Sequence, residues 1–247
     1  MTDKPFSLVF IEALLERCLS AVEWQEQGDP RMALSLADDS AAAAGYLRYW
    51  QAPDASPLDR MLHMRLMAGP VETQLMFIFG KPASSMPHFH AQAVQFPPAG
   101  CVYNVDLLPR LDPVDHPEWF ERVFAPLRRP YRQATADKDN SCNQAPANPA
   151  LALYMSPYGI ASSQTTREEL ERVSPSVDAY LEHYLSLAAE SGWDECDAAD
   201  MCARDSRHLA KFFADDMDPR AWNGVYRIIG EASGRQLKAL IEQPAQR

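Results

Sequence analysis

The chain has no long hydrophobic run, and its cysteines are few and scattered. No apolar stretch among its 247 residues approaches the roughly 18–20 needed to span a bilayer. The first residues, Met1–Pro5, lack the charged and apolar regions of a signal peptide, so we expect a cytoplasmic protein without a membrane segment. The five cysteines include no C-x-x-C pair, which argues against a disulfide framework and against a structural zinc site.

Positive charge is also scarce. Against 34 Asp and Glu there are 23 Lys and Arg, a net charge of −11, and nucleic acid is a poor partner for such a chain because duplex binding depends on clustered cations. One segment, 120–140, is richer in cations: Arg122, Arg128, Arg129, Arg132 and Lys138. It is either an anion-binding patch or a solvated loop with scattered charges.

The order of the hydrophobic patterns predicts one domain over residues 1–247 that begins with a helical part, 1–52. Apolar residues recur at helical spacing from Leu8 to Val22, and Asp29–Trp50, rich in Ala and Leu, is expected to be a second helix or an irregular segment. From residue 58 the pattern changes. Short apolar runs between turn signals predict strands at Met61–Ala68, Thr73–Phe79, Phe89–Phe96, Val102–Leu107 and Leu151–Ser163.

Helical patterns return after the strands. They cover Pro117–Phe124, Thr166–Ala189 with a near capping box, Asp197–Ala214 and Ala221–Glu242. The polar stretch Thr135–Pro149 is expected to be a mobile loop. Helices first, an antiparallel sheet over 58–163 and helices over 166–242 predict an α/β fold, a three-layer α/β/α sandwich with a central antiparallel sheet.

One predicted strand carries three polar side chains where aliphatic residues would be usual. His88, His90 and Gln92 share one face of the strand because alternate residues point the same way, and Phe89 and Ala91 lie on the other. A single buried histidine most often hydrogen-bonds the backbone. Three polar groups on one face favour a pocket, which we expect between the sheet and the helices.

The two histidines also allow a metal-binding interpretation. Alternate strand positions can offer two imidazoles to one ion, as in cupin-like barrels. Two ligands do not complete a site, and no Glu follows at the spacing that a cupin uses. Further ligands would have to come from histidines elsewhere, namely His63, His116, His183 and His208.

Several short motifs resemble, in order and spacing, those of the ferredoxin-dependent bilin reductase family, which includes phycocyanobilin:ferredoxin oxidoreductase and, more distantly, red chlorophyll catabolite reductase. They are Leu75–Phe79, Pro87–Val94, Asp106–Pro109, Tyr154–Tyr158 and Ile229–Glu231. The resemblance implies an oxidoreductase that binds biliverdin or a related linear tetrapyrrole between the sheet and the C-terminal helices. It further implies no bound cofactor, single electrons from a reduced ferredoxin, a radical mechanism and protons from side chains.

This sequence departs from the family at the positions that the resemblance makes functional. The family's central aspartate falls on Gln92, its upstream histidine near Leu75, and the glutamate before that near His63 or Arg65. We expect these positions to contact the substrate. An amide cannot act as an acid, so the proton would come from His90 or His88, whose imidazoles titrate near neutral pH.

The resemblance places a further functional aspartate in residues 211–219, where Asp216 is favoured over Asp215 and Asp218. Asp218, directly before a proline, is also typical of a helix cap. Arg128 and Arg129 are candidates for holding the substrate's propionates, and the same cations are candidates for the landing surface of an acidic ferredoxin. The alternative function is a non-catalytic linear-tetrapyrrole-binding protein that kept the fold and lost the acids.

Overall fold

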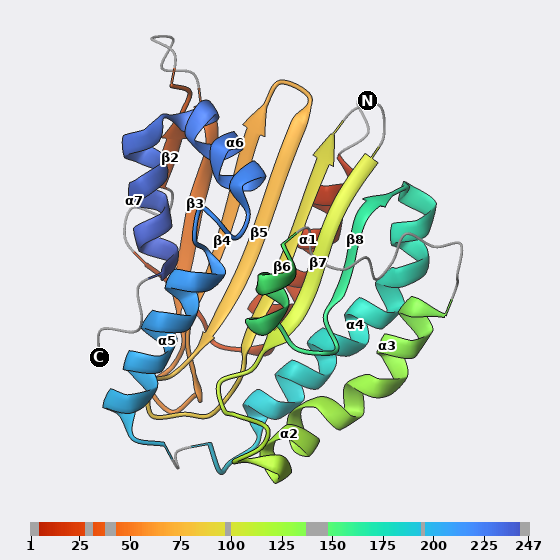
Figure 1. Ribbon diagram of the computed structural model, residues 1–247, viewed down its shortest axis with the longest axis vertical. Helices are drawn as coiled ribbons and strands as arrows, with labels where there is room; N and C mark the ends of the chain where they lie inside the picture. Colours follow the sequence, from red (N-terminus) through yellow and green to blue (C-terminus); the bar gives the residue numbers. More distant parts are fainter. Residues whose placement is uncertain are drawn as a thin grey trace.

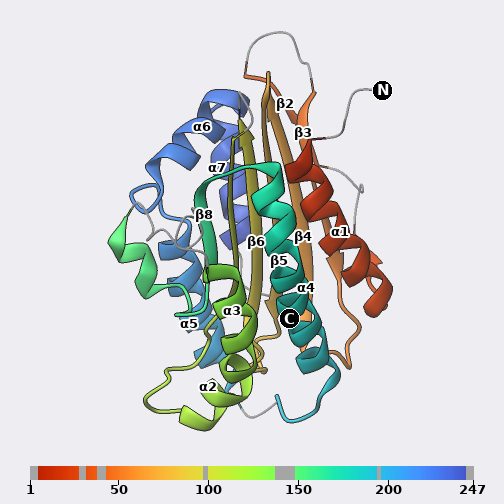
Figure 2. The same cartoon turned by 90° about the vertical axis from the view of Figure 1, so that its right-hand side faces the viewer.

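The structure is a computed structural model that describes residues 5–27, 32–37, 43–96, 100–136, 148–193 and 196–242. These residues form the predicted α/β/α sandwich. Figure 1 looks through the layers, with helices in front of and behind the sheet, and Figure 2 shows the same sheet nearly edge-on between them.

The sheet is antiparallel throughout the described part of the chain. Its eight strands are β1 (Gln25–Glu26), β2 (Met32–Ser35), β3 (Ala43–Gln51), β4 (Leu58–Ala68), β5 (Val71–Gly80), β6 (His88–Phe96), β7 (Gly100–Leu108) and β8 (Ile160–Thr165). They lie in the order β1-β3-β4-β5-β6-β7-β8, and β2 also pairs with β3. The central part is therefore the meander that the alternating patterns predict.

Helices cover both faces of the sheet. Behind it in Figure 1 lie α1 (Phe6–Ala21) and α4 (Arg167–Ala189). In front lie α5 (Ala198–Phe212), α6 (Pro219–Ile229), α7 (Glu231–Glu242) and the 3₁₀ turn η2 (Pro149–Leu153). The connection between β7 and η2 forms α2 (Pro117–Phe124), the 3₁₀ turn η1 (Ala125–Leu127) and α3 (Arg128–Thr135), and α3 packs against α4.

Two apolar cores separate the three layers. On the α1–α4 side, Phe89 of β6 packs with Leu14 of α1 and Tyr184 of α4. On the α5–α7 side, Phe77 of β5 packs with Phe213, the residue that follows α5. Because successive strand residues point to opposite faces, strands β3, β4, β5 and β7 supply apolar residues to both cores. No helix among the described residues is both long and apolar enough to cross a bilayer.

The prediction of a second helix or an irregular segment over 29–50 is wrong. The described residues of that segment contain β2 and β3, and among the described residues up to 52 the one helix is α1. Tyr46, Tyr49 and Trp50 are β-favouring aromatic residues, and β3 pairs with β4 from Gly45 to Gln51. Sheet pairing therefore decided the structure of a segment whose Ala and Leu content favoured a helix.

Two further predictions need correction. The helix expected over Ala221–Glu242 is two helices, α6 and α7, because Gly230 between them has φ 81°. The strand expected from residue 151 begins only at β8 and is preceded by η2. The hairpin of β4 and β5, the helix α2 and the capping box at Thr166 and Glu169 are confirmed, and most of the polar stretch Thr135–Pro149 lies outside the described residues.

Candidate functional site

The two histidines of β6 lie on the face predicted for them. His88 and His90 are each 1% exposed and point toward α5, where they meet Asp205 and Phe212 respectively. Phe89, between them, packs against Tyr184 of α4 on the other face. The strand alternation is thus confirmed, and the site lies beneath the C-terminal helices.

His90 is a buried imidazole without hydrogen bonds. Its ring lies between Phe77, 5.7 Å away by centroid, and Phe212, 5.3 Å away. Within the described residues neither ring nitrogen has a hydrogen-bond partner. Burial lowers the pKa of His90 to about 3, so the ring is neutral. A buried polar group left unpaired costs about 1–3 kcal/mol, which makes this position a candidate for ligand contact.

Strand β7 brings two more polar side chains to the same face. Asp106 lies directly opposite His90, and Asn104 lies opposite Gln92. Residues directly opposite each other in an antiparallel pair share a face, with Cβ atoms roughly 4.5–5.5 Å apart. His90, Gln92, Asn104 and Asp106 therefore form one group, which we call the β6–β7 cluster.

The members of the cluster differ in burial and in partners. Gln92 and Asn104 are half-buried, and Asn104 Oδ1 has no hydrogen-bond partner among the described residues. Asp106 is fully buried and accepts hydrogen bonds from the backbone nitrogen of Ser156, at 2.7 Å, and from the Ser156 hydroxyl. Burial raises the pKa of Asp106 to about 7, although the Ser156 hydrogen bonds oppose the increase.

A third histidine approaches from α5. His208 Nε2 lies 2.8 Å from the carbonyl oxygen of Tyr154, so Nε2 carries the proton and Nδ1 does not. Nδ1 is buried and has no partner in the described part of the chain. The ring stacks on that of Tyr154 at 5.8 Å, and burial lowers the pKa of His208 to about 4.

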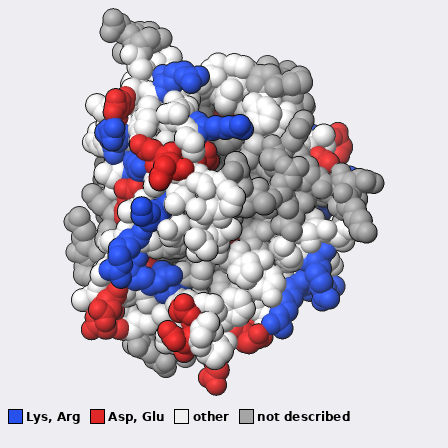
Figure 3. Space-filling view, viewed as in Figure 1, with Lys and Arg blue, Asp and Glu red and all other residues white. Residues whose placement is uncertain are grey.

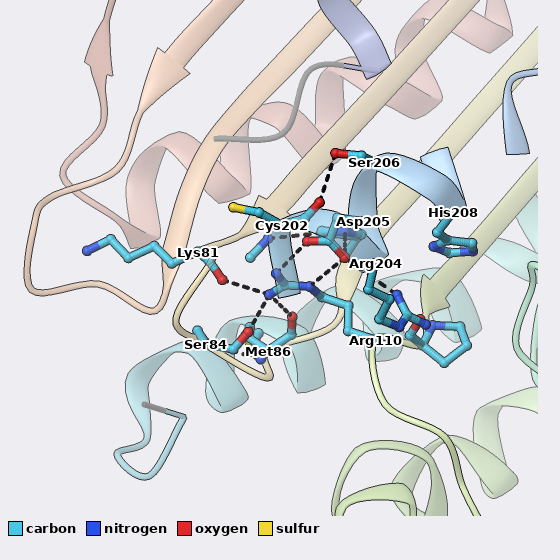
Figure 4. A network of polar contacts seen from close by, with 12 residues as sticks. Lys81, Ser84, Met86, Arg110, Cys202, Arg204, Asp205, Ser206 and His208 are labelled. Carbon is cyan, nitrogen blue, oxygen red and sulfur yellow. Dashed lines mark hydrogen bonds and ion pairs between the residues drawn. The ribbon is translucent and has the colours of Figure 1, made fainter. Parts of the chain in front are cut away.

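His88 contacts Asp205, which belongs with Arg110 to a separate polar network that Figure 4 shows. Its Nδ1 accepts a hydrogen bond from the Gly80 backbone at 3.1 Å, and its Nε2 lies 3.4 Å from Asp205 Oδ1. Asp205 in turn binds Arg110, which is fully buried and donates to the carbonyl oxygens of Lys81, Ser84 and Met86. Burial lowers the pKa of His88 to about 4.

The expectation that His88, His90 and Gln92 line one cavity is therefore wrong for His88, whose ring nitrogens are turned to Gly80 and Asp205. Two cavities are seen elsewhere. One of about 510 Å³ lies at the C-terminal ends of α1 and α4, and one of about 140 Å³ lies beside Asp59 and Lys81. Neither is lined by a residue of the β6–β7 cluster.

The other strand positions named from the resemblance are divided between the two faces. Leu75 pairs with Gln92 and joins the core beneath α5–α7, and its contact with the substrate stays a prediction. His63 pairs with Met76, whose side chain belongs to the opposite core. His63 binds Gln74 at 2.8 Å, and Arg65 binds Glu72 at 3.1 Å.

His63 and Arg65 thus do not share a site with His90, and their prediction as substrate contacts needs correction. A shift of one residue along a strand moves a side chain to the other face. Met64 and Leu62, the neighbours of His63, belong to the core beneath α5–α7.

The predicted carboxylates of residues 211–219 have separate roles. Asp216 is exposed, and its backbone carbonyl accepts from Asn148. Asp215 binds Lys238 at 2.7 Å and Tyr226 at 2.9 Å. Asp218 caps α6 by accepting from the Ala221 backbone, which confirms the cap interpretation. In the part of the chain that the structure describes, no hydrogen bond or ion pair joins these carboxyls to the β6–β7 cluster, and the choice of Asp216 as a catalytic group gains no support.

The arginine segment lies with the opposite layer. Arg128 pairs with Glu121 at 2.6 Å and donates to the Tyr158 hydroxyl, and Arg129 is exposed on the same helix, α3. Arg122 pairs with Glu190 and lies over the Trp193 ring, and Lys138 lies outside the described residues. Figure 3 shows a basic group near α3 apart from another over α5, with uncharged and acidic surface between them. Among the described residues no ion pair or hydrogen bond joins these arginines to the β6–β7 cluster, and their role in holding propionates stays a prediction.

No group of three or more histidine, cysteine, aspartate or glutamate side chains in the described ranges could hold a metal ion. His88 and His90 therefore gain no third ligand there, and the cupin-like interpretation is not supported.

Sequence reasoning missed three members of this region, Asn104, Asp106 and His208. The alternation of Cys101–Pro109 places Asn104 and Asp106 on one face, which was a usable signal. Only the pairing of β7 with β6 shows that this is the face of His90. The sequence around His208 contained no comparable signal, because its role depends on the approach of η2.

The chain is similar in sequence to two plant proteins and in fold to a third. It is 26% identical over 222 residues to a rice (Oryza sativa subsp. japonica) protein named red chlorophyll catabolite reductase 1, chloroplastic, a match that covers 76% of this chain and 66% of the relative. It is 33% identical over 67 residues to red chlorophyll catabolite reductase of Hordeum vulgare, over 27% of this chain and 33% of that protein. No protein-family model matches.

In fold, the chain matches the crystal structure of phytochromobilin synthase from tomato, solved in complex with biliverdin. The TM-score is 0.72 at 16% identity, over 95% of this chain and 82% of the other. The resemblance to the bilin reductases is confirmed. The chain spans about two thirds of the length of its rice relative. We therefore treat the activity of that whole protein as a proposal for this chain.

Proposed function

We propose that this chain is a reductase of a linear tetrapyrrole, a bilin or a related chlorophyll catabolite. The observation that carries the proposal is the β6–β7 cluster, where polar atoms without partners lie on a buried sheet face beneath α5. The curated relatives are named as reductases of a chlorophyll catabolite, and the structural relative holds biliverdin.

The chemistry of the cluster suits such a ligand. A linear tetrapyrrole offers pyrrole N–H donors, lactam carbonyl acceptors and a long apolar conjugated surface. Asn104 Oδ1 and one nitrogen of His90 can accept from pyrrole nitrogens, and the Gln92 amide can donate to a carbonyl. The rings of Phe77 and Phe212 offer apolar surface on either side of His90.

The protein would contribute position and protons, and the conjugated ligand would accept the electrons. A reduced ferredoxin would supply these electrons one at a time, so each turnover passes through a radical of the ligand. A ligand that has gained an electron is more basic and draws a proton from the nearest acid. A cytoplasmic location stays a prediction, and the rice relative is named as chloroplastic.

The test is anaerobic mixing of the purified protein with biliverdin, followed by a ferredoxin reducing system. We expect a spectral shift on mixing and then loss of the biliverdin absorbance with formation of a reduced bilin. His90→Gln should weaken binding by about 10-fold, on the scale of one buried hydrogen bond. His116→Gln, at an exposed position of the N-terminal end of α2, is the matched control.

A second arm replaces biliverdin by a red chlorophyll catabolite, which separates the two substrate classes. If either ligand binds but neither is consumed under reducing conditions, the protein is a tetrapyrrole carrier and the reductase proposal fails. If neither ligand shifts its spectrum at any concentration, the β6–β7 cluster is not a tetrapyrrole site.

A further inference from the structure

Asp106 stands out among the buried groups of the cluster because it is an acid where the sequence has lost one. The position that the family fills with an aspartate is Gln92 on β6, which cannot give up a proton. Asp106 lies on the adjacent strand, on the same face and directly opposite His90. It is fully buried between the sheet and the Tyr154–Gly159 segment.

We propose that Asp106 is the proton donor of the reductive reaction and that Ser156 is the positioning residue that holds its carboxyl and sets its acid strength. This inference rests on the proposed function. It replaces His90, His88 and Asp216, the donors expected from the sequence, and leaves His90 as a hydrogen-bonding contact.

The Tyr154–Gly159 segment is built to fix the carboxyl. Ser156 binds both oxygens of Asp106, one through its backbone nitrogen and the other through its hydroxyl. The segment is itself fastened to both helix layers, because His208 of α5 binds the carbonyl of Tyr154 and Tyr180 of α4 binds the carbonyl of Tyr158. At Gly159 even a Cβ atom would lie 3.3 Å from Asp106 Cγ.

The other titratable groups packed around Asp106 do not compete with it near neutral pH. His90 on β6 and His208 on α5 have pKa values lowered by burial to about 3 and about 4, so both are neutral. Tyr180 on α4 has a pKa raised by burial and by Asp106 itself, so it keeps its proton. Arg110, at the end of β7, is engaged by Asp205. Asp106, with a pKa of about 7, is the group that changes its charge in this range.

The reaction balances with this single acid. Reduction of one carbon–carbon double bond of the tetrapyrrole takes two electrons and two protons. Two equivalents of the reduced one-electron donor are each oxidised once and supply the electrons. For each electron, Asp106 transfers its proton to the ligand radical or anion, becomes a carboxylate held by Ser156, and regains a proton from solvent.

The first experiment compares Asp106→Asn with wild type and with Asp115→Asn, which removes an exposed carboxyl. Asp106→Asn should keep biliverdin affinity within about threefold and lower reductive turnover by about 10²-fold or more, the scale of a lost general acid. The one-electron-reduced ligand should then accumulate and be visible by electron paramagnetic resonance. Turnover of Asp106→Asn within a few-fold of wild type would overturn the assignment.

The second experiment uses Ser156→Ala with Ser156→Thr as the conservative control. In the ligand-free protein, infrared titration should show a buried carboxylic acid with a midpoint near 7 that is missing in Asp106→Asn. Loss of a hydrogen bond to the charged form should move this midpoint up by about one unit in Ser156→Ala. The high-pH limb of turnover should move by the same amount, and Ser156→Thr should restore both.

The outcomes separate the two proposals. If wild type binds the tetrapyrrole and never reduces it, the proposed function fails, and the role of Asp106 as a proton donor fails with it. If wild type reduces it and Asp106→Asn does so equally well, only the acid assignment fails. A Ser156→Ala variant whose carboxyl midpoint and turnover limb both stay in place would refute the role of Ser156.

Discussion

The buried ion pair between Arg110 and Asp205 joins the end of β7 to α5, and its removal should be among the most destabilising single changes in the protein. Arg110 is fully buried, and Asp205 is 4% exposed. The guanidinium binds both carboxylate oxygens, at 3.2 and 2.5 Å, and three backbone carbonyls of residues 81–86. Asp205→Asn keeps the shape and removes the charge, which leaves Arg110 buried without a counter-ion.

Breaking a buried pair in this way costs about 3–5 kcal/mol. A chain of this size loses about 2–4 °C of melting temperature per kcal/mol, so the midpoint should fall by roughly 6–20 °C. Chemical denaturation at pH 7 gives the free energy and thermal denaturation gives the midpoint. The matched control is Glu231→Gln, which breaks the exposed pair with Arg235 and should leave stability close to wild type because exposed pairs contribute little.

The pH dependence gives an independent check. Burial alone would raise the pKa of Asp205, but His88 and Arg110 hold it below its ordinary value. A carboxyl with a lowered pKa contributes stability above its unfolded pKa of about 4, and that stability is lost as the pH falls further. The difference between wild type and Asp205→Asn should therefore shrink below pH 4. If Asp205→Asn is no less stable at pH 7 than Glu231→Gln, the argument is wrong.

Two further predictions concern backbone conformation and histidine burial. Gly230→Ala should destabilise the protein by about 1–3 kcal/mol because the φ of 81° and ψ of 157° at this position suit only glycine. Gly224→Ala, inside α6 with open space around the Cβ position, should stabilise the protein by about 0.5–1 kcal/mol. Urea unfolding should therefore give changes of opposite sign in the free energy of unfolding for the two variants. Burial lowers the pKa of His90 to about 3, so below pH 6.5 the unfolded chain binds one proton more than the folded chain and stability falls with pH. His90→Leu should reduce the slope of this loss between pH 6.5 and 4 by up to about 1.4 kcal/mol per pH unit. His116→Gln is the control, and an unchanged slope in His90→Leu would contradict the reasoning.

Local patterns were sufficient for much of the fold. The hairpin of β4 and β5 can be predicted from two short apolar runs and a Gly-Pro turn. The capping box of Thr166 and Glu169 marks the N-terminus of α4. The failure at β3 has the opposite cause. Its residues include Ala, Leu and Arg, which suit a helix, and their strand conformation is set by pairing with β4, a long-range interaction that composition does not report.

The site shows the same division between local and long-range information. Alternation within β6 was enough to place His90 on one face and Phe89 on the other. Placing His63 required an alignment to distant relatives, in which an offset of one residue reverses the face. His88 was assigned to the correct face, but its partners, Gly80 and Asp205, come from other elements, and they turn a candidate proton donor into a structural group.

The proposed donor Asp106 lies on β7, whereas the resemblance implies an acid at the position of Gln92 on β6, and this difference bears on the chemistry. Asp106 lies one strand over from Gln92 and two residues along, because it is paired with His90, a separation of roughly 8 Å from strand spacing and rise. One extended tetrapyrrole can contact both positions, so loss of the acid at Gln92 need not abolish protonation. It would, however, deliver the proton to a different atom of the ligand. A Gln92→Asp variant would place acids at both positions, and a changed ratio of reduced isomers relative to wild type would show that the position of the acid directs the site of reduction.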